Sequence, residues 1–138
     1  MTLQAAAGLR VLDHPVIRQF LTFASVGLVA TLAHYGVLIA LVEGLRAPVV
    51  AATSCGFLAG ASVSYALNQR LTFKARPALM AGFAKFALVG LVGAGFNALI
   101  VGGLTRLGLH YLLAQMAATG LVLFWNFYAS RRFVFRPA

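Results

Sequence analysis

Long apolar stretches alternate along the chain with short polar or basic segments. The first stretch, residues 19–42, contains 24 residues without Lys, Arg, Asp or Glu, which is enough to cross a hydrocarbon core that needs ~20 helical residues. Similar stretches cover residues 48–69, 86–105 and 108–130. Since lipid offers no hydrogen bonds to the backbone, stretches of this kind fold as helices. The pattern predicts an all-α integral membrane protein with four transmembrane helices.

Composition and charge support this prediction. Of the 138 residues, 62% are hydrophobic and 9% are charged, whereas a soluble domain carries about 25% charged residues. The net charge of +9 comes from 11 basic residues against two acids, Asp13 and Glu43. The basic residues lie at the ends of the apolar stretches and in the links between them, so membrane topology explains the charge better than a nucleic-acid partner does.

The distribution of Lys and Arg predicts the orientation. Nine of them fall in the N-terminal segment, the middle link and the C-terminal tail: Arg10, Arg18, Arg70, Lys74, Arg76, Lys85, Arg131, Arg132 and Arg136. The two remaining links hold one each, Arg46 and Arg106. Because cytoplasmic segments of membrane proteins are enriched in Lys and Arg, both termini are expected in the cytoplasm.

The chain is also an internal repeat. A shift of 62 residues places residues 64–73 on residues 126–135 and pairs polar, arginine and aromatic positions: Ser64 with Asn126, Asn68 with Ser130, Arg70 with Arg132 and Phe73 with Phe135. Further upstream the shift is 63, and it pairs Phe20 with Phe83, Phe23 with Phe86, Gly27 with Gly90 and His34 with Asn97. We therefore predict a single membrane domain, residues 1–138, built from two parallel helical hairpins, repeat one over 18–76 and repeat two over 81–136.

Small residues recur every four positions in two of the predicted helices. The second helix carries Ala52, Gly56, Gly60, Ser64 and Asn68, and the third carries Gly90, Ala94, Ala98 and Gly102. Such ridges let helices approach closely in lipid. Packing within one chain is the favoured interpretation, and a dimer interface is the alternative.

Two sets of polar residues are candidates for contact with a substrate. His34, Ser64 and Asn97 lie inside apolar stretches, where they need hydrogen-bond partners or a polar path through the membrane. Interhelical hydrogen bonding and a role in substrate or proton movement both remain open for His34 and Asn97.

The second set lies at the predicted cytoplasmic ends and consists of Asn68, Arg70, Asn126 and Arg132. A guanidinium group offers a planar fork of donors that suits phosphate. Each arginine lies two residues beyond a polar residue of the preceding helix face, roughly 200° around an ideal helix, so it joins that face only if the helix changes there or the side chain reaches back. Membrane anchoring is the alternative role.

No catalytic or metal-binding pattern is visible. The sequence has no pair of carboxylates for acid–base catalysis, no Cys and His at metal-ligand spacing and no glycine-rich phosphate loop. We predict no catalytic residue, no metal site, no cofactor and no enzymatic activity.

These motifs resemble the GtrA family of small four-helix membrane proteins, which is associated with bacterial surface-polysaccharide glycosylation. The resemblance covers residues 18–135, with the Phe and Gly openings, the polar residue in each odd helix and the doubled closing motif. It implies a flippase, or a partner of one, for a polyprenyl-phosphate-linked monosaccharide, acting as a multi-pass protein of the bacterial inner membrane. Family members often carry Asp at the position of His34 and Asn at the position of Ser64.

Partners and alternatives follow from the same comparison. The expected partners are the lipid-linked sugar, membrane lipids, a glycosyltransferase and, because four short helices enclose little space, further copies of the chain. One alternative function is a non-transporting scaffold for a glycosyltransferase. A second is an exporter resembling the small multidrug-resistance family, which would need a carboxylate inside the membrane, whereas Glu43 lies at a helix end.

Overall fold

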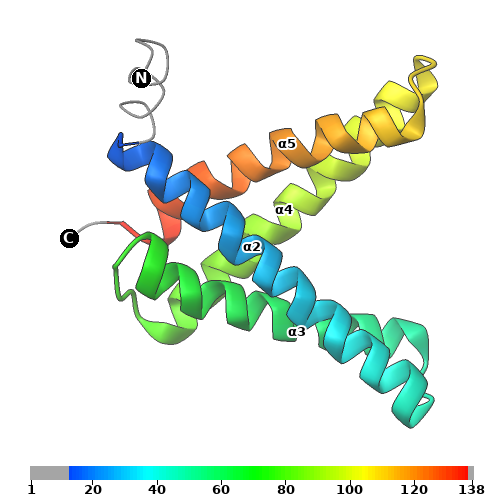
Figure 1. Ribbon diagram of the computed structural model, residues 1–138, viewed down its shortest axis with the longest axis horizontal. Helices are drawn as coiled ribbons and strands as arrows, with labels where there is room; N and C mark the ends of the chain where they lie inside the picture. The colour runs from blue at the N-terminus through cyan, green and yellow to red at the C-terminus, as the bar shows by residue number, and fades with distance from the viewer. Residues whose placement is uncertain (1–12, 137–138) are drawn as a thin grey trace, which may run out of the picture. The chain divides into compact units, whose positions relative to one another are not determined.

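The computed structural model describes residues 13–136, and within this range the chain is helical with no strand. Its long helices are α2 (Pro15–Ile39), α3 (Val49–Leu67), α4 (Leu79–Arg106) and α5 (Tyr111–Ala129) (Figure 1). Three of them continue directly into five-residue π-helical turns, η1 (Ala40–Gly44), η2 (Asn68–Thr72) and η3 (Ser130–Val134). The four resulting segments are each long and apolar enough to cross a membrane. The predicted all-α architecture with four spans is confirmed.

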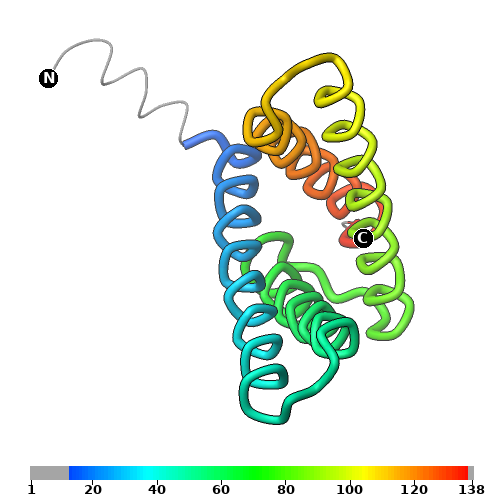
Figure 2. The backbone as a smooth tube through the Cα atoms, turned by 90° about the vertical axis from the view of Figure 1, so that its right-hand side faces the viewer, coloured from blue at the N-terminus to red at the C-terminus, as the bar shows by residue number. Residues whose placement is uncertain are grey.

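The chain divides into two compact units, unit 1 (Met1–Lys74) and unit 2 (Ala75–Ala138), with the boundary inside the predicted basic link. In unit 1, α2 and α3 pack side by side as an antiparallel hairpin, and in unit 2, α4 and α5 do the same (Figure 2). Arg10 and both chain ends lie outside the described residues, and the cytoplasmic placement of the termini stays a prediction.

Several helix boundaries differ from the predicted ones. The first helix begins at Pro15 rather than at residue 19. The third helix begins at Leu79 rather than residue 86, so Lys85 lies in the helix and not in the link. At 28 residues α4 is about 42 Å long, which exceeds a hydrocarbon core of about 30 Å, so its first turns can extend beyond the lipid. The fourth helix begins at Tyr111 rather than residue 108, because Gly108 adopts a left-handed φ of 91° that ends the preceding helix.

The turns at the tips of the two hairpins are built alike. Arg46 occupies the left-handed position in unit 1, with φ 53°, and Gly108 occupies the equivalent position in unit 2. In each turn a backbone N–H reaches back to a helix carbonyl, from Ala47 to Leu41 in unit 1 and from Leu109 to Leu104 in unit 2, both at 3.0 Å. We call these the turn ends of the hairpins.

The π-helical turn η1 explains why the repeat offset changes from 63 to 62. Unit 1 has one residue more than unit 2 between the matched parts of its two helices. A π-helical turn spends one residue more per hydrogen-bonded turn than an α-helix does. η1 lies in this interval of unit 1, whereas the equivalent part of α4 is regular α-helix.

Of the two predicted ridges of small residues, one forms a packing face and the other does not. On α3, Ala52, Gly56 and Gly60 are buried, and they pack against α2, where a methyl group added to Gly60 would come within 2.9 Å of the Ala30 backbone oxygen. On α4, Ala94 and Ala98 are exposed. The buried residues of α4 are instead Gly82, Val89 and Gly93, so the predicted ridge of the third helix does not pack against α5, and the alternative of a dimer interface stays a prediction.

Candidate functional site

At the end of each hairpin opposite the turn end, an aromatic pair joins the two helices. Phe23 of α2 meets Phe73 edge to face with ring centroids 6.0 Å apart, and Phe86 of α4 meets Phe135 in the same way at 6.0 Å. Phe23 and Phe86 belong to the opening motif of the repeat, residues 20–27 and 83–90, and Phe73 and Phe135 belong to its closing motif, residues 64–73 and 126–135. The two motifs are therefore contact partners, and each phenylalanine pair holds the π-helical turn of its hairpin against the neighbouring helix.

The π-helical turns have the same register in the two units. The backbone N–H of Phe73 donates to the backbone oxygen of Asn68, and the backbone N–H of Phe135 donates to the backbone oxygen of Ser130, both at 2.9 Å. These i→i+5 bonds define the wider turn. The last turn of each unit therefore widens to a π-helical turn instead of fraying.

In unit 1 the polar side chains along this turn bond to one another. The Asn68 amide donates to the Ser64 hydroxyl at 3.2 Å, and the Thr72 hydroxyl donates to the Asn68 carbonyl oxygen at 2.7 Å. From α2, the Gln19 amide donates to the Thr72 backbone oxygen at 3.1 Å. Asn68 is completely buried, so its amide is used inside the hairpin.

We call this row of hydrogen-bonded side chains, Ser64, Asn68 and Thr72, the ladder of unit 1. The equivalent ladder of unit 2 is incomplete. Its positions hold Asn126, Ser130 and Val134, so the hydroxyl that Thr72 supplies in unit 1 is missing. Ser130 is completely buried. The Asn126 Oδ1 and the Ser130 Oγ are both enclosed and have no hydrogen-bond partner within the described residues. Gly93 of α4 makes room for the Asn126 amide, because a methyl group there would lie 2.5 Å from Oδ1.

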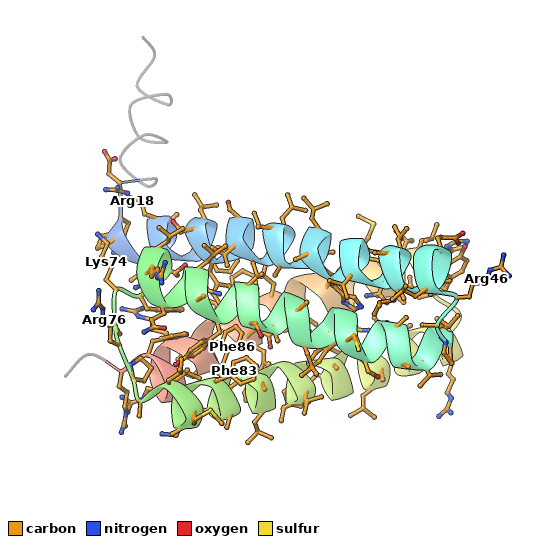
Figure 3. The ribbon with its side chains drawn as sticks, turned by 90° about the horizontal axis from the view of Figure 1, so that it is seen from below. Arg18, Arg46, Lys74, Arg76, Phe83 and Phe86 are labelled. Carbon is orange, nitrogen blue, oxygen red and sulfur yellow. The ribbon has the colours of Figure 1, made fainter. Side chains whose placement is uncertain are left out.

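Arg70 and Arg132 are exposed on these turns. Each lies two residues beyond a fully buried residue, Asn68 or Ser130, so the structure places the guanidinium groups and the buried polar groups on different sides of one turn. In unit 1, Arg18 and Lys74 lie at one end of the hairpin and Arg46 lies at the other (Figure 3). We call the ends that carry η2 and η3 the basic ends.

The polar residues inside α2 and α4 are bonded across their hairpins. His34 Nε2 and the Thr53 hydroxyl are 3.3 Å apart in unit 1, and the Gln115 amide donates to Asn97 Oδ1 at 2.9 Å in unit 2. Thr53 and Gln115 follow the first residue of α3 and α5 by four positions, which places them about 6 Å from the turn end. His34 and Asn97 therefore both make interhelical contacts, and their role in substrate or proton movement stays a prediction. Sequence reasoning missed both partners, although the 62-residue shift pairs Thr53 with Gln115.

Unit 2 has one further contact between its helices. The Trp125 indole N–H donates to the Val89 backbone oxygen at 3.2 Å, and the indole meets Phe96 edge to face at 5.0 Å. Trp125 is the single tryptophan of the chain, and it directly precedes Asn126. Any change at the unit 2 ladder therefore occurs beside a natural fluorophore.

Residues 22–135 match the family model described as GtrA/DPMS, transmembrane domain. The chain belongs to the GtrA/DPMS transmembrane-domain family. The predicted resemblance to GtrA proteins is confirmed, over nearly the range that was expected. A search of curated proteins gives no match to the chain.

Membership of the GtrA/DPMS family makes the chain a multi-pass membrane protein of a family linked to glycosylation. The family is associated with lipid-linked sugars and membrane lipids, and GtrA-like members are generally transporters or flippases rather than catalysts. Among residues 13–136, no three His, Cys, Asp or Glu side chains gather in a way that could hold a metal ion. The chemistry available at the basic ends is that of arginine, amide and hydroxyl groups.

Proposed function

We propose that this GtrA/DPMS-family protein moves a polyprenyl-phosphate-linked monosaccharide from the cytoplasmic to the outer leaflet of the bacterial inner membrane, for glycosylation of cell-surface polysaccharide. Both termini are cytoplasmic in this proposal, so the basic ends of the hairpins face the leaflet in which the lipid-linked sugar is made. The protein supplies binding and passage and catalyses no bond change. Family membership and the paired arginines of η2 and η3 support the proposal.

The arginines are suited to capture the phosphate. Arg70 and Arg132 occupy matching positions on two turns that have the same backbone geometry, and both side chains are exposed. Guanidinium binds phosphate through charge-assisted, bidentate hydrogen bonds. Asn68, which the sequence assigned to the same phosphate site, is buried and bonded within its turn. In this proposal Asn68 and Asn126 therefore support the turns that carry the arginines, and the guanidinium groups hold the phosphate. The prenyl tail stays in the bilayer while the headgroup is held.

The sugar then needs polar groups along its way. His34, Ser64 and Asn97 form the proposed path, and each is only partly buried. His34 and Asn97 are bonded to α3 and α5 near the turn ends, and Ser64 is bonded to Asn68 nearer the basic end. A sugar hydroxyl can take the place of either partner in such a bond, because it both donates and accepts.

Transport into proteoliposomes tests this function. Wild-type protein and an Arg70→Ala, Arg132→Ala double variant are reconstituted with a panel of polyprenyl-phosphate monosaccharides, and transbilayer movement is measured. The matched control is Arg46→Ala, Arg106→Ala, which removes the same charge from exposed positions next to the turn ends. We expect the wild type and the control to move at least one lipid, and the first double variant to lose at least about tenfold in rate, as expected when charge-assisted contacts are removed.

Two results would contradict the proposal. A folded wild-type protein that moves no lipid of the panel would end the transport interpretation and favour the scaffold alternative, which co-purification with a glycosyltransferase would then support. Equal losses in both double variants would show that charge in general, rather than the arginines of η2 and η3, governs movement.

A further inference from the structure

The two units differ in how the polar side chains at three aligned positions of the closing motif are bonded. In unit 1, Ser64, Asn68 and Thr72 bond to one another. In unit 2, the Asn126 Oδ1 and the Ser130 Oγ have no partner among the described residues, although both atoms are enclosed. Buried polar side chains in folded proteins are nearly always hydrogen-bonded, and an exception needs an explanation such as bound water or another bound group. At these three aligned positions the exception falls in repeat two.

The chemistry of the two atoms restricts what can bind them. An amide oxygen accepts hydrogen bonds and cannot donate, whereas a serine hydroxyl does both. A phosphate oxygen at neutral pH is an acceptor and therefore satisfies Ser130 alone. A hydroxyl group can donate to Asn126 and accept from Ser130 at the same time. Residues four apart on a helix face have Cβ atoms about 5–6 Å apart, a gap that one bridging hydroxyl spans with two hydrogen bonds.

The surroundings of Asn126 are consistent with a site that receives a group from outside. Asn126 is partly exposed as a residue, so part of it is accessible while its oxygen is not. Gly93 leaves the amide the space that a side chain on α4 would take. Arg131 and Arg132 follow Ser130 directly and are exposed, so a phosphate bound by either arginine would hold an attached sugar close to this helix end.

We propose that Asn126 and Ser130 form a hydroxyl-binding site for the sugar of the lipid-linked substrate, and that this site exists in repeat two alone. The equivalent residues of repeat one stabilise their own turn, because the Asn68 amide donates directly to the Ser64 hydroxyl and the Thr72 hydroxyl donates to the Asn68 carbonyl oxygen. The protein is thus symmetric in the phosphate-binding arginines and asymmetric in sugar recognition. This inference rests on the proposed function for the identity of the ligand, and it is tested by equilibrium binding rather than by transport.

Trp125 provides the measurement. Purified protein in a detergent that contains no sugar is titrated with farnesyl phosphate and with farnesyl-phosphate esters of glucose, galactose and mannose, and tryptophan fluorescence is followed. We expect the wild type to bind at least one glycosylated probe about tenfold more tightly than farnesyl phosphate, since one well-made hydrogen bond is worth about that factor.

Two variants of unit 2 and one control separate a binding role from a structural role. Ser130→Ala removes the hydroxyl, and we expect the preference for the glycosylated probe to fall to within about threefold of unity. Val134→Thr supplies the hydroxyl that Thr72 provides in unit 1, and we expect it to raise the unfolding midpoint while weakening the same preference. Ser62→Ala removes a serine hydroxyl of unit 1 that bonds to the Leu58 backbone oxygen of its own helix, and we expect it to leave the preference unchanged.

Several outcomes would overturn this inference. One is a wild type that does not distinguish any glycosylated probe from farnesyl phosphate, which would mean that water alone satisfies Asn126 and Ser130. Another is a Val134→Thr variant that becomes more stable and still prefers the glycosylated probe, since the buried atoms would then have only a structural part. If transport persists without the preference, this inference fails and the function stands; if the preference persists without transport, the site stands and the flippase proposal fails.

Discussion

The two hairpins of this protein solve the same packing problem with different residues. At one crossing point, unit 1 places Gly60 of α3 against Ala30 of α2, and unit 2 places Gly93 of α4 against Val122 of α5. These positions are equivalent by the repeat. The glycine of this pair is on the second helix of unit 1 and on the first helix of unit 2, so each unit keeps one glycine at the crossing point.

A second pair of positions shows the same exchange of size. In unit 1 the His34 ring lies directly against Gly56. The equivalent residues of unit 2 are the shorter Asn97 and the larger, fully buried Ala118. The bonded pairs repeat the pattern, because the long His34 meets the short Thr53, whereas the shorter Asn97 meets the long Gln115. The distance between two packed helices constrains the combined size of the two facing side chains, but it does not determine which helix carries the larger one.

The phenylalanine pairs at the basic ends behave differently, since both units keep phenylalanine at all of these positions. Phe23 and Phe86 meet Phe73 and Phe135 with nearly the same geometry. An edge-to-face pair depends on ring against ring, so neither partner can be exchanged for a smaller one. The repeat is therefore easy to see in the sequence at the basic ends and hard to see in the middle of the helices.

The largest effect on this comparison is expected from Gly56→Ala. The added methyl group would overlap the His34 ring and lie 2.8 Å from the His34 backbone oxygen, and we expect a loss of about 1–3 kcal/mol. Unfolding in mixed micelles, followed by far-UV circular dichroism, measures it. A second change, His34→Asn, reproduces the unit 2 pair and should recover part of the loss.

Gly90→Ala is the matched control, because nothing lies within 4 Å of a methyl group at that position. The control should be neutral or stabilising by up to about 1 kcal/mol, since alanine favours the helix. If Gly56→Ala costs no more than Gly90→Ala, or if His34→Asn adds to the loss instead of reducing it, the size compensation between units is not what limits packing.

A smaller effect is expected from Trp125→Phe, which removes a contact that unit 2 has and unit 1 lacks. The variant loses the hydrogen bond to the Val89 oxygen and part of the contact with Phe96, so we expect about 1–2 kcal/mol of destabilisation in the same unfolding experiment. Phe133→Leu, at an exposed aromatic residue, should change stability by less than about 0.5 kcal/mol. Equal effects of the two substitutions would exclude a special role for the indole.

The smallest effect is expected from Thr53→Val, which removes the partner of His34 while keeping the shape of the side chain. Interhelical hydrogen bonds in membranes are worth about 0.6 kcal/mol on average, and the unfolding free energy should fall by about that amount. Ser54→Ala is the control, because the Ser54 hydroxyl bonds to its own helix at the Val50 oxygen. We expect Gln115→Ala to lower the unfolding free energy more than Thr53→Val does, because Gln115 bonds to both Asn97 and Thr119. The reverse order would contradict the equivalence of the two interhelical hydrogen bonds, those of His34 and of Asn97.

Much of the fold could be predicted from the sequence, because helix length and charge placement follow from the bilayer itself. The four spans and the hairpin repeat needed no knowledge of contacts. Helix ends were less predictable, since Leu79 begins its helix outside the apolar stretch. The face of α4 that packs within its hairpin was not predicted, because this helix contains many small residues and spacing alone cannot tell the stripe with Gly93 from the stripe with Gly90.

The candidate site could be predicted in its residues but not in its arrangement. The doubled motif identified Arg70 and Arg132, and the 200° separation correctly raised the question of whether they share a side with the polar residues. The answer depended on η2 and η3, which no local composition indicates. The difference between Thr72 and Val134 was visible in the alignment of the repeats, yet its meaning required the burial of Ser130.

The π-helical turns also show how a helical hairpin absorbs a change of length. η2 and η3 lie at the same register of the two units. η1 has no counterpart in unit 2, and it coincides with the change of offset from 63 to 62. The extra residue of unit 1 is taken up as one wider turn inside a helix, so the turn end and the basic end of each hairpin keep equivalent residues.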